Sequence, residues 1–217
     1  MSKKNFVITL EGVPAVGKST VASILEQEHG YCRIPEVNEL FPERPSPEPA
    51  HWYALKQLER SHIATQNEYS LLDGDIFQVI WLSWIYPDRG FIEHQKAADL
   101  FIDNAESLRL PSLFVYLYID EDIRYQRELE REMKRGHDYQ QFIKKYQRYK
   151  SMNVPQQALF EAIDKQYPGW VLFLDNNDSH ACAKKIAQRC HTARMPSPKE
   201  FVVWLRGWLL QHNPITR

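Results

Sequence analysis

Short apolar runs alternate with amphipathic and charged segments along most of the 217-residue chain. Five of these runs lack the polar alternation of a half-exposed strand, which is typical of strands buried in a parallel sheet. The predicted strands cover residues 6–10, 31–34, 69–72, 113–119 and 170–174. Segments predicted to be helical lie at 18–29, 50–66, 91–109, 121–135, 138–152, 178–193 and 198–211. The pattern predicts an α/β fold in which a parallel sheet lies between two layers of helices.

The carboxyl ends of the predicted strands share a polar residue. Asp73, Asp120 and Asp175 each follow a predicted strand directly. In a doubly wound parallel sheet, ligands bind beyond the carboxyl ends of the strands, so we expect the functional site at this edge. Five prolines between Pro35 and Pro49 predict that residues 41–50 form an extended loop.

One motif at this edge carries specific chemistry. The segment Gly12-Val-Pro-Ala-Val-Gly17-Lys18-Ser19 matches the pattern G-x-x-x-x-G-K-S/T, and it lies between a predicted strand and a predicted helix. Glycines let the backbone approach a phosphate closely, and the N–H groups of such a loop point at phosphate oxygens. The alternative is a chance glycine-rich turn, which the flanking strand and helix disfavour.

We therefore expect this loop to bind the phosphates of a nucleoside triphosphate. Lys18 supplies a positive charge to the β- and γ-phosphates, and Ser19 offers a hydroxyl to Mg²⁺. Pro14 has no N–H, so the donors must come from later positions. The predicted nucleotide-binding residues are Gly12, Val13, Pro14, Ala15, Val16, Gly17, Lys18, Ser19 and Thr20.

The rest of the sequence distinguishes between classes of triphosphate-binding protein. A GTPase needs Asn-Lys-x-Asp after a late strand, whereas residues 175–178 read Asp-Asn-Asn-Asp and lack the lysine. A motor-type ATPase places a glutamate beside the aspartate of the third strand, but Asp73 is followed by Gly74. Phosphoryl transfer to a small molecule instead needs clamped phosphates, a metal and positive charge over the transferring group.

An arginine series supplies a candidate for that charge. Arg124, Arg127, Arg131 and Arg135 are spaced three to four residues apart, so they share one face of a predicted helix. Their planar guanidinium groups suit the oxygens of a phosphate. We expect a helical lid over the phosphates at about 124–138. The alternative is a solvated helix with internal Glu–Arg pairs, since glutamates are interleaved with the arginines.

Two carboxylates complete the predicted site. Glu36 follows the second predicted strand and is our candidate to accept the proton of an acceptor hydroxyl, with Glu39 as a weaker neighbour. Asp73, at the end of the third strand, is our candidate for holding Mg²⁺, with Asp75 close by. A surface glutamate and ordinary turn chemistry are the respective alternatives.

Aromatic residues gather in two places whose role the sequence leaves open. A planar acceptor such as a nucleobase would stack on the first group, although Phe77, Trp81 and Trp84 also have the helical spacing of core residues. That group comprises Trp52, Tyr53, Phe77, Trp81, Trp84 and Tyr86. An apolar stripe at 201–209 predicts core packing or a subunit contact.

Composition narrows the partners. The chain has 27 Lys and Arg against 28 Asp and Glu, so its net charge of −1 gives no general attraction to nucleic acid or to an anionic membrane. We find no run that is long and apolar enough to span a bilayer and no secretory signal segment. Three widely spaced cysteines predict neither a disulfide framework nor a zinc site. We expect a cytoplasmic protein without nucleic-acid or membrane partners.

Leu10-Glu-Gly12-Val-Pro-Ala-Val-Gly17-Lys18-Ser19-Thr20 resembles the opening of P-loop kinases of the deoxynucleoside kinase and thymidylate kinase group. The resemblance, over roughly residues 5–190, implies a five-stranded parallel sheet of order 2-3-1-4-5 and a helical lid. It also implies a base at Glu36 and lid arginines at Arg127 and Arg131. Gly74 departs from the family, which usually has an arginine there that helps to hold the acceptor.

Together these expectations describe one kinase-like domain spanning 1–217, with a C-terminal helix at about 198–211. The predicted activity is ATP-dependent and Mg²⁺-dependent phosphoryl transfer to a small-molecule acceptor, with nucleosides and nucleotides as candidates. Lys18, Glu36, Arg127 and Arg131 are the predicted catalytic residues, and Ser19 and Asp73 the metal ligands. A regulatory nucleotide switch that acts through a protein partner is the alternative. The acceptor, the choice between ATP and GTP, and a homodimer stay open.

Overall fold

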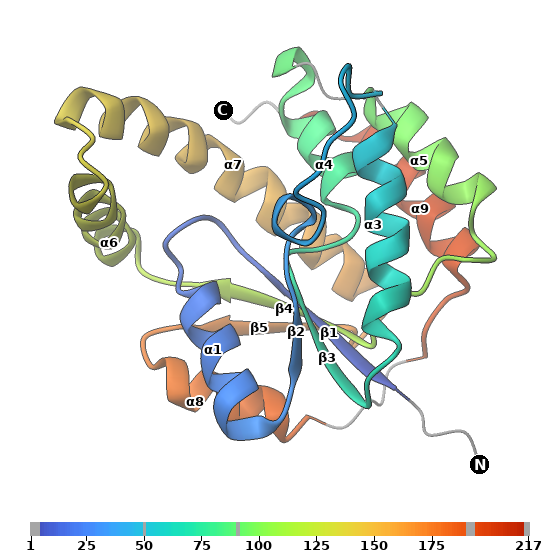
Figure 1. Cartoon of the computed structure of the whole chain (residues 1–217), viewed down its shortest axis with the longest axis horizontal. Coiled ribbons are helices and arrows are strands. Elements are labelled where there is room, and N and C mark those ends of the chain that lie inside the picture. The colour runs from blue at the N-terminus through green and yellow to red at the C-terminus, as the bar shows by residue number, and fades with distance from the viewer. Residues whose placement is uncertain (1–4, 50, 90–91, 190–193, 215–217) are drawn as a thin grey trace.

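A parallel sheet of five strands forms the centre of the molecule (Figure 1). The structure is a computed structural model, which describes residues 5–49, 51–89, 92–189 and 194–214. The strand order is β2-β3-β1-β4-β5, as predicted. Their bounds are β1 Phe6–Glu11, β2 Cys32–Ile34, β3 Tyr69–Asp73, β4 Leu113–Tyr118 and β5 Val171–Asp175. Each bound lies within one residue of the prediction, and the central strands β1, β3 and β4 are buried on both faces of the sheet as their apolar runs predict.

Helices cover both faces of the sheet (Figure 1). On one face α1 (Lys18–His29) lies beside α8 (Ser179–Ala187). The other face carries α3 (Trp52–Ala64), α4 (Gln78–Ile85), α5 (His94–Asp103), α7 (Tyr139–Gln166) and α9 (Pro198–Gln211). The short helices α2 (Val37–Leu40) and η1 (Pro87–Arg89) lie in the connections. Among the described residues, no helix is long and apolar enough to cross a membrane.

The helix α6 (Glu121–Lys134) and the first half of α7 project beyond the carboxyl end of the sheet as an α-helical hairpin (Figure 1). Asp120 begins α6 by accepting hydrogen bonds from the N–H groups of Asp122 and Ile123. This aspartate is therefore a helix cap and does not belong to the site. The hairpin includes residues 124–138, which we expected to form a lid.

The helices α7 and α4 differ from the sequence expectation. The helix α7 continues through Pro155 to Gln166, although we expected it to end at residue 152. A proline inside a helix costs one hydrogen bond, which burial of Leu159, Phe160 and Ile163 against the sheet offsets. The helix α4 was not predicted as an element, although Phe77, Trp81 and Trp84 have helical spacing, because it is apolar on nearly all sides and has no distinct polar face.

The remaining boundary differences lie at chain turns. The helix α5 covers ten residues and ends at Asp103, where turns begin at Asn104, rather than spanning 91–109. Parts of three predicted helices, at residue 50, residue 91 and residues 190–193, lie outside the described residues.

Candidate active site

The loop between β1 and α1 has the backbone that the glycine pattern predicted. Gly12 and Gly17 have φ angles of 128° and 92°, and Ala15 is also left-handed at 68°. A side chain at Gly12 would overlap the carbonyl oxygen of Leu117 on β4, so only glycine fits there. The loop thus curls closely over the end of the sheet, and its last residue begins α1. Such a turn presents N–H groups and the positive end of a helix to an anion.

Asn176, just after β5, holds this loop in place. Its side chain is fully buried and donates from Nδ2 to the carbonyl oxygen of Val16 at 2.6 Å. Its backbone N–H donates to Tyr118 at 2.8 Å. A side chain at Gly17 would overlap the Asn176 amide. Residues 175–178 lack the lysine of a guanine-binding motif, and it is the long-range contact with Val16 that gives Asn176 its role.

The Lys18 side chain folds back over the loop. Its ammonium group donates to the carbonyl oxygens of Gly12 and, at 3.2 Å, Val13. Burial lowers the pKa of Lys18, and the nearby carboxylates of Glu11, Asp73 and Glu36 oppose that effect. The lysine is therefore within electrostatic range of all three acids at the sheet edge.

A cavity of about 830 Å³ opens above the loop, and we call it the phosphate cavity after the ligand that we expect there. It brings together most of the residues that the sequence assigned to the site. These lining residues are Pro14, Ala15, Gly17, Lys18, Ser19, Thr20, Glu36, Asp73, Arg127 and Arg131. Gly12, Val13 and Val16 lie buried beneath it and shape the loop from below. The cavity is lined from the hairpin by Arg135, Lys145 and Tyr149 as well.

The lid arginines differ in their partners. Arg131 is paired with the buried Glu128, whereas Arg127 has no ion pair among the residues that the structure describes. Arg124 does not line the cavity: it is buried, pairs with Glu121 at 2.7 Å and stacks on Tyr146. The helix therefore contains the Glu–Arg pairs of the alternative interpretation, and it also presents arginines to the phosphate cavity.

Glu132 fixes the hairpin by joining α6 to α7. Its buried carboxylate accepts hydrogen bonds from Lys145 at 2.7 Å and Arg135 at 3.1 Å, and it contacts His137 at 2.6 Å. Burial alone would raise the pKa of Glu132, but the bonds from Lys145 and His137 lower it to about 2. These contacts place Lys145, which the sequence analysis did not single out, in the wall of the phosphate cavity.

Glu36 lies where this cavity meets a second one. The second cavity has a volume of about 510 Å³, and Glu36 and Asn38 line both. Its other lining residues are Arg44, Glu48, Pro49, Tyr53, Gln78, Val79, Leu82 and Ile92. The side chain of Glu36 is open to solvent through these cavities, yet the surrounding walls remove part of its hydration. That loss of hydration, aided by Asp73, raises the pKa of Glu36 above its ordinary value of 4.5.

Asp73 and Asp75 face in different directions. Asp73 lines the phosphate cavity and accepts two hydrogen bonds from the Arg33 guanidinium. Asp75 is buried and accepts a hydrogen bond from Trp81 Nε1 at 3.2 Å. The Ser19 hydroxyl and the Asp73 carboxylate offer hard oxygen ligands in one cavity. They suit Mg²⁺, which is typically bound through few protein oxygens together with phosphates and water.

A buried acidic pair lies under the loop, and the sequence analysis missed it. Glu11, the last residue of β1, accepts hydrogen bonds from the Asp75 backbone N–H and from Gln156 Nε2 at 2.9 Å. Burial raises the pKa of Glu11, and the neighbouring Asp75 raises it further. Burial also raises the pKa of Asp75. No spacing rule reveals this pair, because Asp75 is 64 residues away from Glu11 in the sequence.

Three of the six aromatic residues that were candidates for stacking on an acceptor belong to the core. Phe77, Trp81 and Trp84 are at least 95% buried. Tyr53 is the aromatic residue of that group that lines the second cavity. The stripe on α9 also packs inward, through Phe201, Val202, Leu205 and Leu209. The alternative interpretation, core packing, is correct for these residues.

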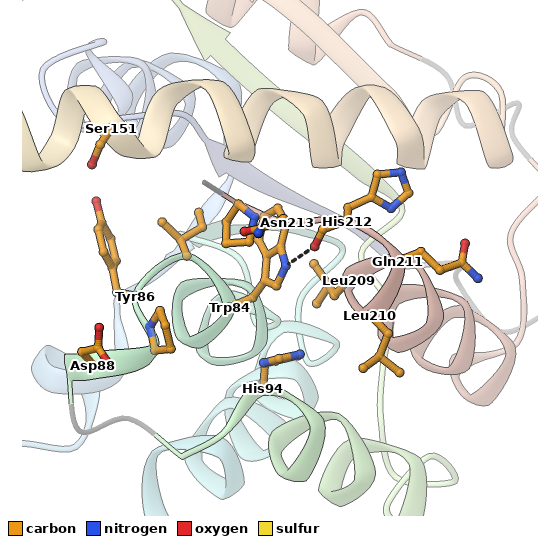
Figure 2. A pocket seen from close by; sticks show the side chains of 13 residues that line it. Trp84, Tyr86, Asp88, His94, Ser151, Leu209, Leu210, Gln211, His212 and Asn213 are labelled. Atoms are coloured by element: carbon orange, nitrogen blue, oxygen red, sulfur yellow. Dashed lines mark hydrogen bonds between the residues drawn. The ribbon is translucent and has the colours of Figure 1, made fainter. Parts of the chain in front are cut away.

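A third cavity, of about 760 Å³, lies away from the loop and is lined by residues of α4, α5, α7 and the C-terminal segment (Figure 2). Trp84 projects into its centre and donates from Nε1 to the His212 carbonyl oxygen at 2.9 Å. His94 and Asp88 lie along one side of it. Because none of the residues lining this cavity comes from the phosphate-binding loop or the lid helix, we do not assign it to the active site.

Comparisons with known proteins agree with this geometry at the level of the fold. The structure is similar to that of deoxyadenosine kinase from M. mycoides with bound dATP, with a TM-score of 0.55 and 14% sequence identity, over 83% of this chain and 97% of that chain. The YorR protein from Bacillus subtilis, in complex with phosphorylated GDP, matches with a TM-score of 0.48 and 19% identity, over 83% and 92% of the two chains. No protein-family model and no curated protein matches the sequence. The first similarity confirms the predicted α/β fold, a five-stranded parallel sheet of order 2-3-1-4-5 with helices on both faces.

Proposed function

We propose that this protein is a kinase that transfers the γ-phosphoryl group of ATP to a hydroxyl group of a small molecule. The observation that carries the proposal is the position of Glu36 in the wall shared by two cavities, one with the phosphate-binding loop and one with apolar, amide and charged side chains. A donor in the first cavity and an acceptor in the second would meet at this carboxylate. Nucleosides and nucleotides are the first acceptors to test, since a deoxyadenosine kinase has a similar fold.

In this mechanism the loop N–H groups and Lys18 bind the phosphates of ATP. The acceptor oxygen forms a bond to the γ-phosphorus as the bond from that phosphorus to the bridging oxygen of ADP breaks, and the hydroxyl proton passes to the Glu36 carboxylate. The raised pKa of Glu36 makes it a better proton acceptor near neutral pH. Arg127 and Arg131 stabilise the negative charge on the transferring group.

Mg²⁺, when bound with the phosphates, neutralises part of their charge. Ser19 and Asp73 are the residues that would hold it. The Arg33 guanidinium bonds to Oδ2 of Asp73, which leaves Oδ1 free of this interaction.

The test is whether consumption of ATP depends on an added acceptor. Purified protein is incubated with Mg²⁺, ATP or GTP and a panel of nucleosides, nucleotides and other small hydroxyl compounds, and nucleoside diphosphate and phosphorylated acceptor are both measured. We expect product only with particular acceptors, no product after chelation of Mg²⁺, and a loss of at least about 100-fold in Lys18→Ala at unchanged circular dichroism. Slow hydrolysis that no acceptor accelerates would instead favour the regulatory switch.

A further inference from the structure

Arg60, on α3, lies buried between the ends of β2 and β3. Only 1% of its surface is exposed, and it lines neither of the two cavities at the site. Its guanidinium group has no carboxylate ion pair within the described part of the chain. A charged group is costly to bury unless its hydrogen-bonding capacity is met, so this position needs an explanation.

The guanidinium of Arg60 is held almost entirely by backbone carbonyl groups. Its Nε donates to Pro35 at 2.6 Å, and its Nη2 donates to Ile34 at 3.2 Å and to Asp73 at 2.5 Å. Its Nη1 donates to the Gly74 carbonyl at 2.9 Å and to Gln57 Oε1 at 3.1 Å. These five bonds equal the five N–H groups of an arginine side chain.

The four carbonyl groups lie at the point where strand pairing stops. The register of β2 with β3 ends at the pair Ile34–Leu72. Beyond this pair the two segments of chain are no longer paired with each other. The segment after β2 leads to Glu36, and the other runs through Asp73, the last residue of β3, to Gly74. Arg60 binds both chains there, so it replaces the missing sheet contacts with one rigid planar group.

We propose that Arg60 is a positioning residue that holds Glu36 in a fixed place relative to Asp73. This inference rests on the proposed function, because it is there that Glu36 serves as the base and Asp73 as a metal ligand. A lysine at position 60 would keep the charge, but its single ammonium group does not provide a planar fork that reaches four carbonyls.

We call the five hydrogen bonds of Arg60 the clamp. Hydrogen exchange, measured by mass spectrometry on the full chain with and without MgATP, tests the clamp without needing turnover. In Arg60→Lys we expect exchange to rise at least about 10-fold at residues 35–41 and 74–78, with no change at 12–19. Arg124→Lys removes another buried arginine and serves as the matched control. Arg124 pairs with Glu121 and donates to the Pro14 carbonyl oxygen at 3.4 Å, so we expect this variant to affect the hairpin of α6 and α7 and the loop at Pro14, but not residues 35–41 or 74–78. If Arg60→Lys does not fold, Gln57→Leu removes one of the five bonds and should raise exchange at the same two segments.

A double-mutant cycle then tests whether the clamp acts through Glu36. Misplacing a catalytic group by about 1 Å costs roughly 100-fold, so we expect Arg60→Lys to lower kcat by about 10- to 100-fold at an unchanged KM for ATP. In a Glu36→Gln background the same change should cost less than about 3-fold.

The outcomes separate the two proposals. Equal losses in both backgrounds, or unchanged exchange at the two segments, would overturn the role of Arg60. A wild-type protein that phosphorylates no acceptor would contradict the proposed function, and the exchange data alone would then decide whether Arg60 ties the two chains together.

Discussion

Asn176 donates a hydrogen bond to the carbonyl oxygen of Val16 at 2.6 Å, although the two residues are 160 positions apart. This contact joins the end of β5 to the phosphate-binding loop. It also leaves no room for a side chain at Gly17, since a Cβ there would overlap the Asn176 amide. The loop is therefore kept in its curled form by a buried side chain that follows the edge strand β5.

Replacing Gly17 by alanine should weaken both nucleotide binding and the fold. Gly30→Ala is the matched control, because Gly30 is also left-handed, with φ 71°, but has no atom within 4 Å of an added Cβ. We expect Gly17→Ala to lower the free energy of unfolding by about 1–3 kcal/mol more than the control does. Denaturant unfolding and calorimetric titration with ATP measure the two effects. Equal losses in the two variants would show that the Asn176 contact is unimportant.

Glu36→Gln should lower kcat by roughly 100- to 10,000-fold while leaving the affinity for ATP within about 3-fold of wild type. The reason is that the amide cannot accept the hydroxyl proton but still fills the same space. Glu39→Gln, which changes an exposed neighbour in the same cavity, should stay close to wild type. Steady-state kinetics with the best acceptor decides the matter, and a severe defect in the Glu39 variant alone would transfer the role of the base to that residue.

The rate of transfer should also fall at acid pH, because Glu36 becomes protonated there. Its pKa is raised above 4.5 because the cavity walls remove hydration and Asp73 is nearby. Since the base must be ionised, activity should fall as the pH drops through this raised value, at a higher pH than an unperturbed glutamate would give. A profile of kcat/KM between pH 4.5 and 8, with stability followed in parallel, measures the acid limb.

Arg127 should be important for turnover because it lines the phosphate cavity and none of the described residues neutralises it in an ion pair. We expect Arg127→Met to lower kcat by about 100- to 1,000-fold with little loss of stability. Arg189→Met, at an exposed site outside the cavity, is the control. Activity retained in Arg127→Met would mean that Arg131 and Arg135 provide enough positive charge without it.

Glu132→Gln should loosen the hairpin of α6 and α7. The carboxylate accepts bonds from Lys145 and Arg135, and bonds to charged groups are worth about 1.5–3 kcal/mol each. Because the folded pKa is about 2, below the ordinary value of 4.5, this stability is present above pH 4.5 and is lost as the pH falls toward 2. The difference between wild type and variant in the free energy of unfolding should shrink over that range. Glu130→Gln, on the exposed face of α6, should show no such difference.

Much of the fold could be predicted because the strands of a buried parallel sheet have a local sequence pattern. Strands buried on both faces are uniformly apolar, so runs such as 113–119 stand out from the helices around them. The helix α4 is buried on nearly every side, and its pattern therefore has no polar face to reveal its period. Pro155 predicts the end of a helix, but packing of the following turns against the sheet outweighs its local cost.

The residues of the site also fall into two groups, those that local sequence patterns predict and those that only long-range contacts place. Lys18, Ser19, Glu36, Asp73 and Arg127 could be predicted to share one cavity, because a loop motif and strand ends fix their places in the chain. Arg60, Asn176 and the Glu11–Gln156 bond could not be predicted, because each depends on contacts between segments far apart in the sequence. The role of the aromatic residues stayed open for a related reason, since a buried helix and a ligand platform use the same side chains.

The position of Glu36 on a shared wall has an evolutionary consequence. The groups assigned to transfer come from the loop, the sheet edge and the lid, whereas Tyr53, Val79, Leu82 and Ile92 line the second cavity and not the phosphate cavity. Substitutions at those four positions would alter which molecule is admitted while sparing the reacting groups. Acceptor specificity can therefore change in evolution while the catalytic residues stay the same.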